Sequence, residues 1–250
     1  MRRLAPLAFL AALPLLAQSG SSEAEEQHLR QVLGEAGASP VEFIRALENH
    51  LAKFPESSRK KEIERSIVKA AIEGKDDRRV LLYGERLLEG GEDDPQVLER
   101  VTRILLTKDD RDRAERAFQY ASRFERVLKE LEKEAPRSPQ AKVQFREELD
   151  RNTGRVLVFQ ARAAGNLGRF EEAIALARRG YQTYPTAEAA REIGLLLVKA
   201  GKEGEAVPHF ADAFTISDER NTDEDRAKDR KRMGEEIGRA SCRERVYGTV

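Results

Sequence analysis

The residue types most often used for catalysis and metal binding are sparse in this chain. It has 3 histidines, His28, His50 and His209, which lie far apart in the sequence with no cysteine or acidic partner at metal-ligand spacing. No Gly-rich loop follows a strand pattern, and no serine lies in the context of an activated nucleophile. We therefore predict that the chain is not an enzyme, with no catalytic residues, no metal site and no cofactor, and we interpret the histidines as surface or helix-face residues.

Two acidic clusters, residues 92–94 and 223–225, could suggest calcium binding. Neither has the loop spacing with glycine that a calcium loop requires. Carboxylates are favourable in the first turn of a helix because they oppose the partial positive charge there. We interpret both clusters as solvated helix starts, and the mixed-sign run 225–231 as an exposed helix face.

The single cysteine, Cys242, lies in a segment that breaks the preceding helical spacing. Residues 237–246 can be back-translated as ATC GGA AGA GCG TCG TGT AGG GAA AGA GTG, which resembles a common sequencing adapter read in frame. We interpret residues 237–250 as a non-native, adapter-derived tail and exclude them from fold reasoning. On this interpretation, whatever followed Glu236 in the natural chain is missing.

The first 17 residues have the pattern of a secretory signal peptide. Two arginines precede an apolar run at residues 4–16, and the small residue Ala17 marks the expected cleavage site. The run is shorter than the ~18 to 20 residues that a membrane span requires, and it contains two prolines. We predict a periplasmic or secreted protein, detached from the membrane after cleavage. Residues 18–236 contain no cysteine, so packing alone must stabilise the fold.

The charge of the chain body excludes a large class of partners. The whole chain carries 45 basic and 45 acidic residues, but five arginines fall in the two excluded terminal segments. Without these segments 40 basic and 44 acidic residues remain, a net charge of about −4. A mildly acidic body gives no electrostatic footprint for nucleic acid or anionic lipid.

Strong helix signals punctuate the chain from residue 23 onward. Ser39-Pro40, Asp94-Pro95 and Ser138-Pro139 each combine an N-cap residue with a proline at the first helical position. Ser58 could cap another helix, which Gly74 could end in the left-handed conformation. No segment alternates apolar and polar residues as a strand does. Short one-sided helices must pack against one another, so we predict an all-α fold.

Two adjacent segments repeat with a period of 33 residues. Gly168, Ala173, Ala177 and Gly180 correspond to Gly201, Ala206, Phe210 and Ala213, and upstream Ala161 corresponds to Gly194. Small residues at these positions allow two antiparallel helices to approach closely. Glycine between the helices allows a tight reversal of the chain.

The segment LGRFEEAIALARRGYQTYP, residues 167–185, resembles the tetratricopeptide repeat (TPR) family, a helix-turn-helix unit of about 34 residues. Gly168, Phe170, Ala173, Gly180 and Pro185 lie at family positions. The next unit departs, because Glu203 replaces the aromatic residue and Pro208 falls inside the second helix, which predicts a kink or a weaker final repeat. The resemblance implies antiparallel helix pairs stacked as a right-handed α-solenoid.

These patterns divide the chain. We expect a signal peptide at 1–17, an N-terminal helical segment at 18–58, degenerate TPR-like pairs at 59–135, TPR-like repeats at 136–218, a charged helix or linker at 219–236 and the adapter-derived tail at 237–250. Residues 123–150 do not fit the repeat length, which predicts a lengthened helix and an insertion there.

Two functions are compatible with this organisation. The first is an exported scaffold that binds protein or peptide segments in a concave groove, with neither nucleic acid nor membrane as partner. The second is the substrate-positioning part of a truncated exported thioredoxin-like oxidoreductase, because residues 43–58 resemble the beginning of such fusions. A C-x-x-C pair downstream of Glu236 in the genome would distinguish them. The TPR resemblance places six residues in the groove, which are Arg155, Val158, Arg162, Glu188, Arg191 and Leu195.

Overall fold

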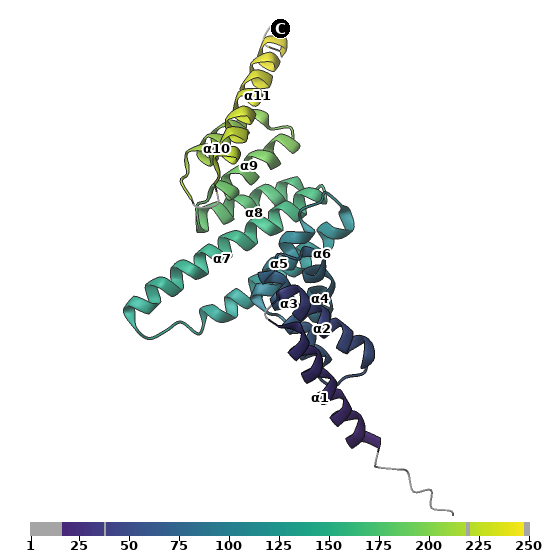
Figure 1. The fold of residues 1–250 in the computed structure, drawn as a ribbon. Helices are drawn as coiled ribbons and strands as arrows, with labels where there is room; N and C mark the ends of the chain where they lie inside the picture. The colour runs from purple at the N-terminus through teal and green to yellow at the C-terminus, as the bar shows by residue number, and fades with distance from the viewer. Residues whose placement is uncertain (1–16, 38, 219–220, 248–250) are drawn as a thin grey trace, which may run out of the picture. The chain divides into compact units, whose positions relative to one another are not determined.

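A computed structural model describes residues 17–37, 39–218 and 221–247, with side chains described from residue 23 to residue 239 within these ranges. The described residues form helices and no strand (Figure 1). The chain divides into two compact units, Met1–Asp76 and Asp77–Val250. The predicted all-α class is confirmed. The helices are α1 (Ala17–Ala36), α2 (Pro40–Lys53), α3 (Lys60–Glu73), α4 (Asp77–Glu89), α5 (Pro95–Leu105), α6 (Arg111–Glu132), α7 (Pro139–Asn166), α8 (Phe170–Thr183), α9 (Ala187–Lys199), α10 (Glu203–Thr215) and α11 (Asp223–Tyr247).

The first unit contains α1, α2 and α3, with α2 packed against both neighbours. The Ser39 hydroxyl accepts a hydrogen bond from the Glu42 N–H at 3.4 Å, and Pro40 opens α2, as the sequence predicted. Isoleucine and leucine side chains along one face of each helix are buried between them. The first 16 residues of the predicted signal peptide lie outside the described residues, and its cleavage stays a prediction.

Gly74 ends α3 as expected, but the expected Ser58 cap and the expected left-handed conformation of Gly74 were wrong. The helix starts at Lys60 after Arg59, which makes no capping bond with its side chain, so Ser58 is not the cap. At the other end Gly74 remains right-handed, with φ −77°, and Lys75 takes the positive φ of +55° instead. The Asp76 N–H bonds to Ala71 C=O, so the left-handed residue of this helix end is one position later than the glycine.

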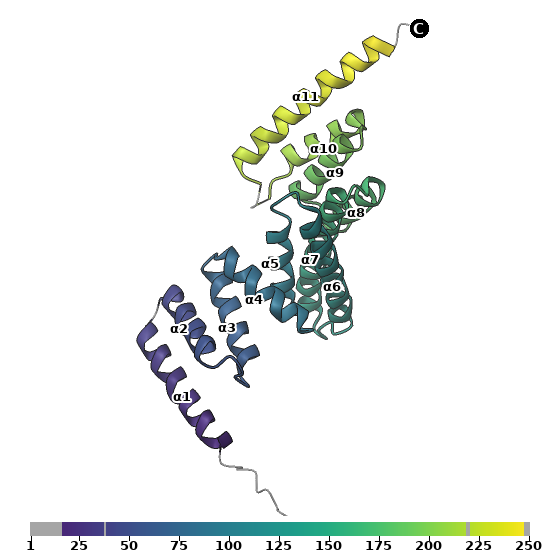
Figure 2. The same ribbon diagram turned by 90° about the vertical axis from the view of Figure 1, so that its right-hand side faces the viewer.

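The second unit stacks helix pairs, and each helix from α4 to α10 packs against the next in the chain (Figure 2). In addition α7 contacts both α5 and α9, so the first helices of successive pairs lie side by side. Asp94-Pro95 and Ser138-Pro139 begin α5 and α7 as predicted. This arrangement is that of stacked TPR-like helix pairs.

The 33-residue correspondence holds in the structure, with one correction. Ala173 and Ala206 are both completely buried at helix crossings, as expected. Gly168 and Gly201 were expected to be buried there too, but both are exposed and have φ values of +80° and +76°. They provide the left-handed residue that ends one helix before the next begins, which is a conformation that glycine adopts without a Cβ clash.

Other glycines bring helices into close contact. A Cβ on Gly180 of α8 would lie 2.9 Å from the carbonyl oxygen of Gly154 in α7, and a Cβ on Gly194 would meet the Phe210 ring at 2.7 Å. Despite Pro208, α10 is helical from Glu203 to Thr215, and Phe210 is almost fully buried in the core. These contacts fix how α7, α8, α9 and α10 face one another.

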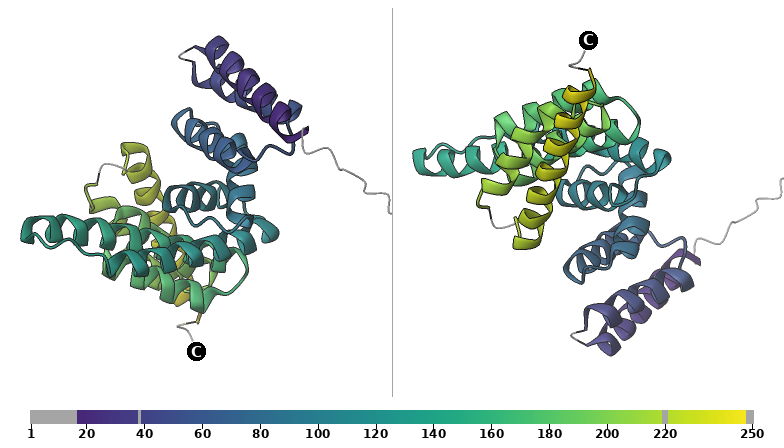
Figure 3. Two further views of the ribbon diagram at one scale, coloured as in Figure 1. Left: turned by 90° about the horizontal axis from the view of Figure 1, so that it is seen from below. Right: turned by 90° about the horizontal axis from the view of Figure 1, so that it is seen from above.

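Helices α6 and α7 are longer than the individual helices of the two repeats, as the spacing of residues 123–150 predicted. Helix α6 has 22 residues and α7 has 28, whereas α8, α9 and α10 have 13 or 14. The start of α7, drawn in teal, projects from the second unit in Figures 1 and 3. Glu132 at the end of α6 pairs with Arg146 of α7 at 2.7 Å, which ties the ends of this α6–α7 hairpin together.

Candidate binding groove

A groove of about 840 Å³ lies along the first helices of successive pairs in the second unit. Helices α5, α7 and α9 contribute to its walls, together with the turn before α9 and the segment between α10 and α11. Five of the six residues that the sequence placed in a groove line it, and Leu195 does not. The lining residues are Arg103, Arg151, Arg155, Val158, Arg162, Tyr184, Thr186, Ala187, Glu188, Arg191, Ser217, Asp218 and Asn221.

Helical spacing explains which side chains reach the groove. Residues 151, 155, 158 and 162 are spaced by four, three and four along α7, so they share one face of that helix. The same spacing could have identified Arg151, which the sequence reasoning missed. Leu195 lies one turn beyond Arg191 on α9, where it packs against the hydrophobic core of α7 to α10. Arg103 was missed because the earlier helix pair keeps little of the repeat motif.

Arg162 is held in the groove by two carboxylates of α9. Its Nε lies 2.8 Å from Glu192 Oε2, and its Nη2 lies 3.3 Å from Glu188 Oε1. Burial opposes the charge of Arg162, but the attraction of Glu192 and Glu188 outweighs it and raises the pKa of the guanidinium above its ordinary value. Arg162 therefore keeps its charge, and the carboxylates fix the direction of its donors.

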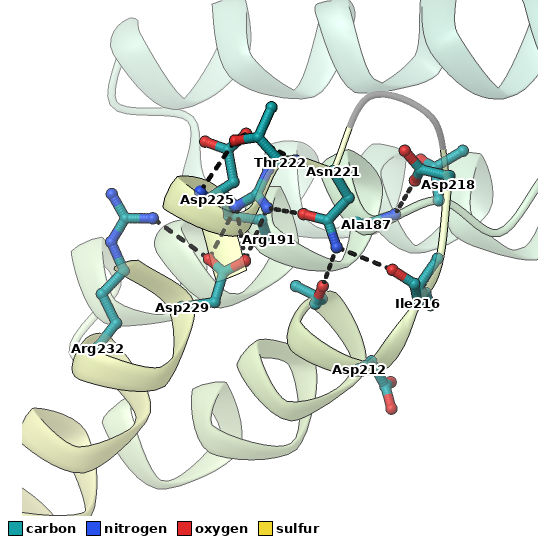
Figure 4. A network of polar contacts seen from close by, with 12 residues as sticks. Ala187, Arg191, Asp212, Ile216, Asp218, Asn221, Thr222, Asp225, Asp229 and Arg232 are labelled. Carbon is teal, nitrogen blue, oxygen red and sulfur yellow. Dashed lines mark hydrogen bonds and ion pairs between the residues drawn. The ribbon is translucent and has the colours of Figure 1, made fainter. Parts of the chain in front are cut away.

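Arg191 joins the groove to α11 through a network of polar contacts (Figure 4). Its Nε and Nη2 donate to both carboxylate oxygens of Asp229, at 2.7 to 3.0 Å, and Nη2 also donates to Asn221 Oδ1 at 2.9 Å. Asp229 is 0% exposed. The Asn221 amide donates to the carbonyl oxygens of Ala213 and Ile216, at 2.9 and 2.8 Å. One groove arginine thus also anchors the last helix.

The remaining groove arginines are also held from behind. Arg103 pairs with Glu99 at 2.7 Å, and its guanidinium lies 5.1 Å from the centre of the Phe159 ring. Arg155 reaches Glu99 at 3.8 Å. Arg151 pairs with Glu147 at 2.9 Å. Because Glu99, Glu147, Glu192 and Asp229 are not lining residues, the surface of the groove presents five arginines against two carboxylates, Glu188 and Asp218.

The histidines lie outside this groove. We expected surface or helix-face residues; all three lie on helices, and His28 and His209 are half-buried, but His50 is buried and is not a surface residue. In the first unit the Nδ1 atoms of His28 and His50 are 3.1 Å apart, and His50 is fully buried against Phe54. Burial lowers the pKa of His28, and Lys53 and His50 lower it further. Among the residues whose side chains are described, no three histidine, cysteine or acidic groups are placed to hold a metal ion.

Comparison with models of known families finds no match, and neither does comparison with curated proteins. Solved structures similar to it include a double mutant of MamA RS-1, at 13% identity with a TM-score of 0.49, which covers 77% of this chain and 92% of that one. A TPR protein from Thermus thermophilus is 16% identical, with a TM-score of 0.43, and covers 85% and 98%. A TPR protein from Parabacteroides merdae is 12% identical, with a TM-score of 0.36, and covers 86% and 93%. The fold assignment therefore rests on the helix pairs described above.

None of the helices in the described part of the chain is both long enough and apolar enough to cross a membrane.

Proposed function

We propose that the chain is an exported, non-catalytic helical-repeat scaffold that binds a protein segment in the groove formed by α5, α7 and α9. The observation that carries this proposal is the lining of five arginines along one continuous hollow of the second unit. Stacked helix pairs expose the first helix of each pair on one side, and extended segments bind well along such a surface.

The arginines determine the chemistry of the segment. A guanidinium has five N–H donors, and Arg162 directs Nε and Nη2 toward carboxylates while its Nη1 provides further donors. Such donors bind carboxylates and carbonyl oxygens. Because the carboxylates behind the arginines fix their orientation, little side-chain entropy is lost on binding. We expect an extended segment rich in aspartate or glutamate.

Selection from a displayed library of random 12-residue peptides tests this proposal. The native chain should enrich acidic peptides, and the variant Arg103→Gln/Arg155→Gln should lose most of this enrichment. The matched control is Arg178→Gln/Arg179→Gln, which removes the same charge from exposed positions of α8 outside the groove. Equal enrichment by both double variants, with unchanged melting temperatures, would contradict the proposal.

Export is part of the proposal and is supported by the composition of residues 1–17. Expression of the full chain in a bacterium should yield a mature protein in the periplasm or the medium. Its N-terminal sequence should begin at Gln18. Recovery of the intact N-terminus from the cytoplasm would contradict export and leave the binding proposal standing.

A further inference from the structure

A second hollow, of about 620 Å³, adjoins the groove where the α6–α7 hairpin projects. Its place follows from the length of α7, which begins at Pro139, well before the close contact of Gly154 with Gly180 near the end of α8. Its walls come from the end of α6, the start of α7 and the end of α8. They are formed by Glu132, Ala135, Lys142, Val143, Phe145, Arg146, Glu147, Asp150, Thr183 and Tyr184.

The hollow exposes apolar side chains that the fold does not use. Val143 is 69% exposed, more than Val41, Leu82 or Ile237, the other large apolar residues exposed in the described part of the chain. Phe145 and Tyr184 are partly exposed beside it. Its lining includes the cations Lys142 and Arg146 and the anions Glu132, Glu147 and Asp150, so this hollow lacks the arginine excess of the groove. An uncharged, apolar side chain fits these walls better than a carboxylate.

The two hollows adjoin at one residue, because Tyr184 lines both of them. Arg151 of the groove lies over the Tyr184 ring, 5.5 Å from its centre, and its Nε lies 3.3 Å from the Tyr184 hydroxyl oxygen. The close packing of Gly154 against Gly180 holds Tyr184 against α7. A Cβ added to Gly154 would lie only 2.9 Å from the Cβ of Tyr184. The Tyr184 ring therefore has a fixed position between an apolar and an arginine-lined surface.

The geometry points to one occupant for both hollows: an extended acidic segment that carries a large apolar side chain, leucine or phenylalanine, near one end. This inference rests on the proposed function and adds the partner's apolar anchor to it. Val143 and Arg162 are 19 positions apart on α7, about 28 Å at a rise of ~1.5 Å per residue. About nine extended residues cover that length. The charge difference between the two hollows sets the order of side chains in the segment, apolar over Val143 and acidic over the arginines.

The same 12-residue library tests this inference with one further variant, Val143→Asp. The native chain should select peptides with a leucine or phenylalanine displaced from an acidic run, and the variant should select acidic runs without that residue. Val41→Asp is the matched control, because Val41 is a valine of the first unit that is 51% exposed. Val143→Ala adds no charge to the hairpin, and this variant should also select the leucine or phenylalanine less often, though with a smaller change than Val143→Asp.

Affinity measurements give the expected size of the effect. A synthetic selected peptide should bind Val143→Asp ~tenfold more weakly than the native chain, and replacing its apolar residue by serine should cause a similar loss. The serine-substituted peptide and the Val143→Asp variant together should bind little more weakly than when only one of the two changes is made. Acidic selection with no apolar residue would overturn this inference and leave the proposed function intact, whereas no selection at all would overturn the proposed function. A native chain that elutes as a dimer, and a Val143→Asp variant that elutes as a monomer, would assign the hollow to self-association instead.

Discussion

Two contacts in the second unit are built from opposite kinds of side chain. Where α8, α9 and α10 cross, the buried residues are alanine, glycine, leucine, isoleucine and phenylalanine. Where α11 joins this stack, the fully buried Asp229 and the buried Asn221 form polar contacts with Arg191. The crossings depend on volume, which tolerates small changes, whereas the α11 contact depends on every partner being present. The two contacts should therefore fail in different ways.

Removing one member of the polar contact should have the largest effect. Asp229→Ala leaves Arg191 without its carboxylate in a largely buried site, and we expect a loss of about 3 kcal/mol in the free energy of unfolding. Urea denaturation followed by circular dichroism measures this loss. The control Asp223→Ala removes an exposed carboxylate from the same helix and should change stability little.

The double variant Arg191→Met/Asp229→Leu distinguishes two causes of instability, which are an unpaired buried charge and the loss of side-chain packing. Replacing both charges by apolar side chains should recover most of the stability that Asp229→Ala loses, because no buried charge remains unpaired. A double variant as unstable as Asp229→Ala would show that the α11 contact depends on shape, and the contrast between the two regions would not hold.

Overpacking an apolar crossing should cost less. Ala173 is completely buried in the core of α7 to α10, and leucine there must displace neighbouring side chains. We expect Ala173→Leu to lose about 1 to 3 kcal/mol of stability, measured by the same denaturation. The neighbouring Ala175 of α8 is exposed, so Ala175→Leu is the control and should be nearly neutral. An unchanged denaturation midpoint for Ala173→Leu would argue against tight packing at this crossing.

A pH change should weaken the contact between His28 and His50 in the first unit. Burial lowers the pKa of His28. The charges of Lys53 and His50 lower this pKa further, and the charge of Glu35 raises it. The unfolded chain therefore binds the proton more readily, so the stabilising contribution is present above the ordinary pKa of about 6.5 and is lost as pH falls from there through the lower pKa of the folded state. Amide hydrogen exchange of α1 and α2 should become roughly twofold faster at pH 5.5 than at pH 7.5, after correction for intrinsic rates.

The variant His28→Gln should remove most of this acceleration in α1 and α2. Burial also lowers the pKa of His209, which lies on α10 in the second unit. His209→Gln should therefore leave the exchange of α1 and α2 unchanged. Equal exchange rates at both pH values in the native chain would show that the contact between His28 and His50 does not respond to protonation.

The smallest expected effect is that of removing the predicted adapter-derived tail. The helix α11 extends to Tyr247, but Ile237, the first residue of the tail, is 48% exposed, and Arg239 pairs with Glu236 from an exposed position. Deletion of residues 237–250 should leave the melting temperature unchanged to within about 1 °C. A fall of several degrees would show that the tail packs against the fold, and would make Cys242 worth testing as a functional thiol.

The sequence predicts this molecule best where local signals decide the structure. Cap-and-proline pairs located the starts of α2, α5 and α7, and the 33-residue repeat located the crossing at Ala173. Helical spacing also brought five of the six predicted residues to one groove. These features depend on neighbours within a turn or within one repeat, which a single sequence displays directly.

Contacts between distant residues could not be predicted in this way. His28 and His50 are 22 positions apart on different helices, and only the packing of α1 against α2 brings their rings together. Arg191 and Asp229 are 38 positions apart, and each reads in the sequence as an ordinary exposed charge. The apolar hollow at Val143 depends on how far α7 extends past α8, which repeat spacing shows only as an insertion.

The turns at Gly168 and Gly201 have a consequence for how such a chain can grow. Besides their similar φ values, they share a hydrogen-bond pattern, with Arg169 N–H bonded to Ala164 C=O at 2.9 Å and Lys202 N–H bonded to Leu197 C=O at 2.8 Å. The segment between them therefore begins and ends on the same backbone geometry. A duplicate of residues 168–200 inserted after Ala200 would connect to the chain through the same turn geometry at both of its ends. Gene duplication or protein engineering could lengthen the scaffold one unit at a time, and each added unit would extend the reach of the groove along a longer partner.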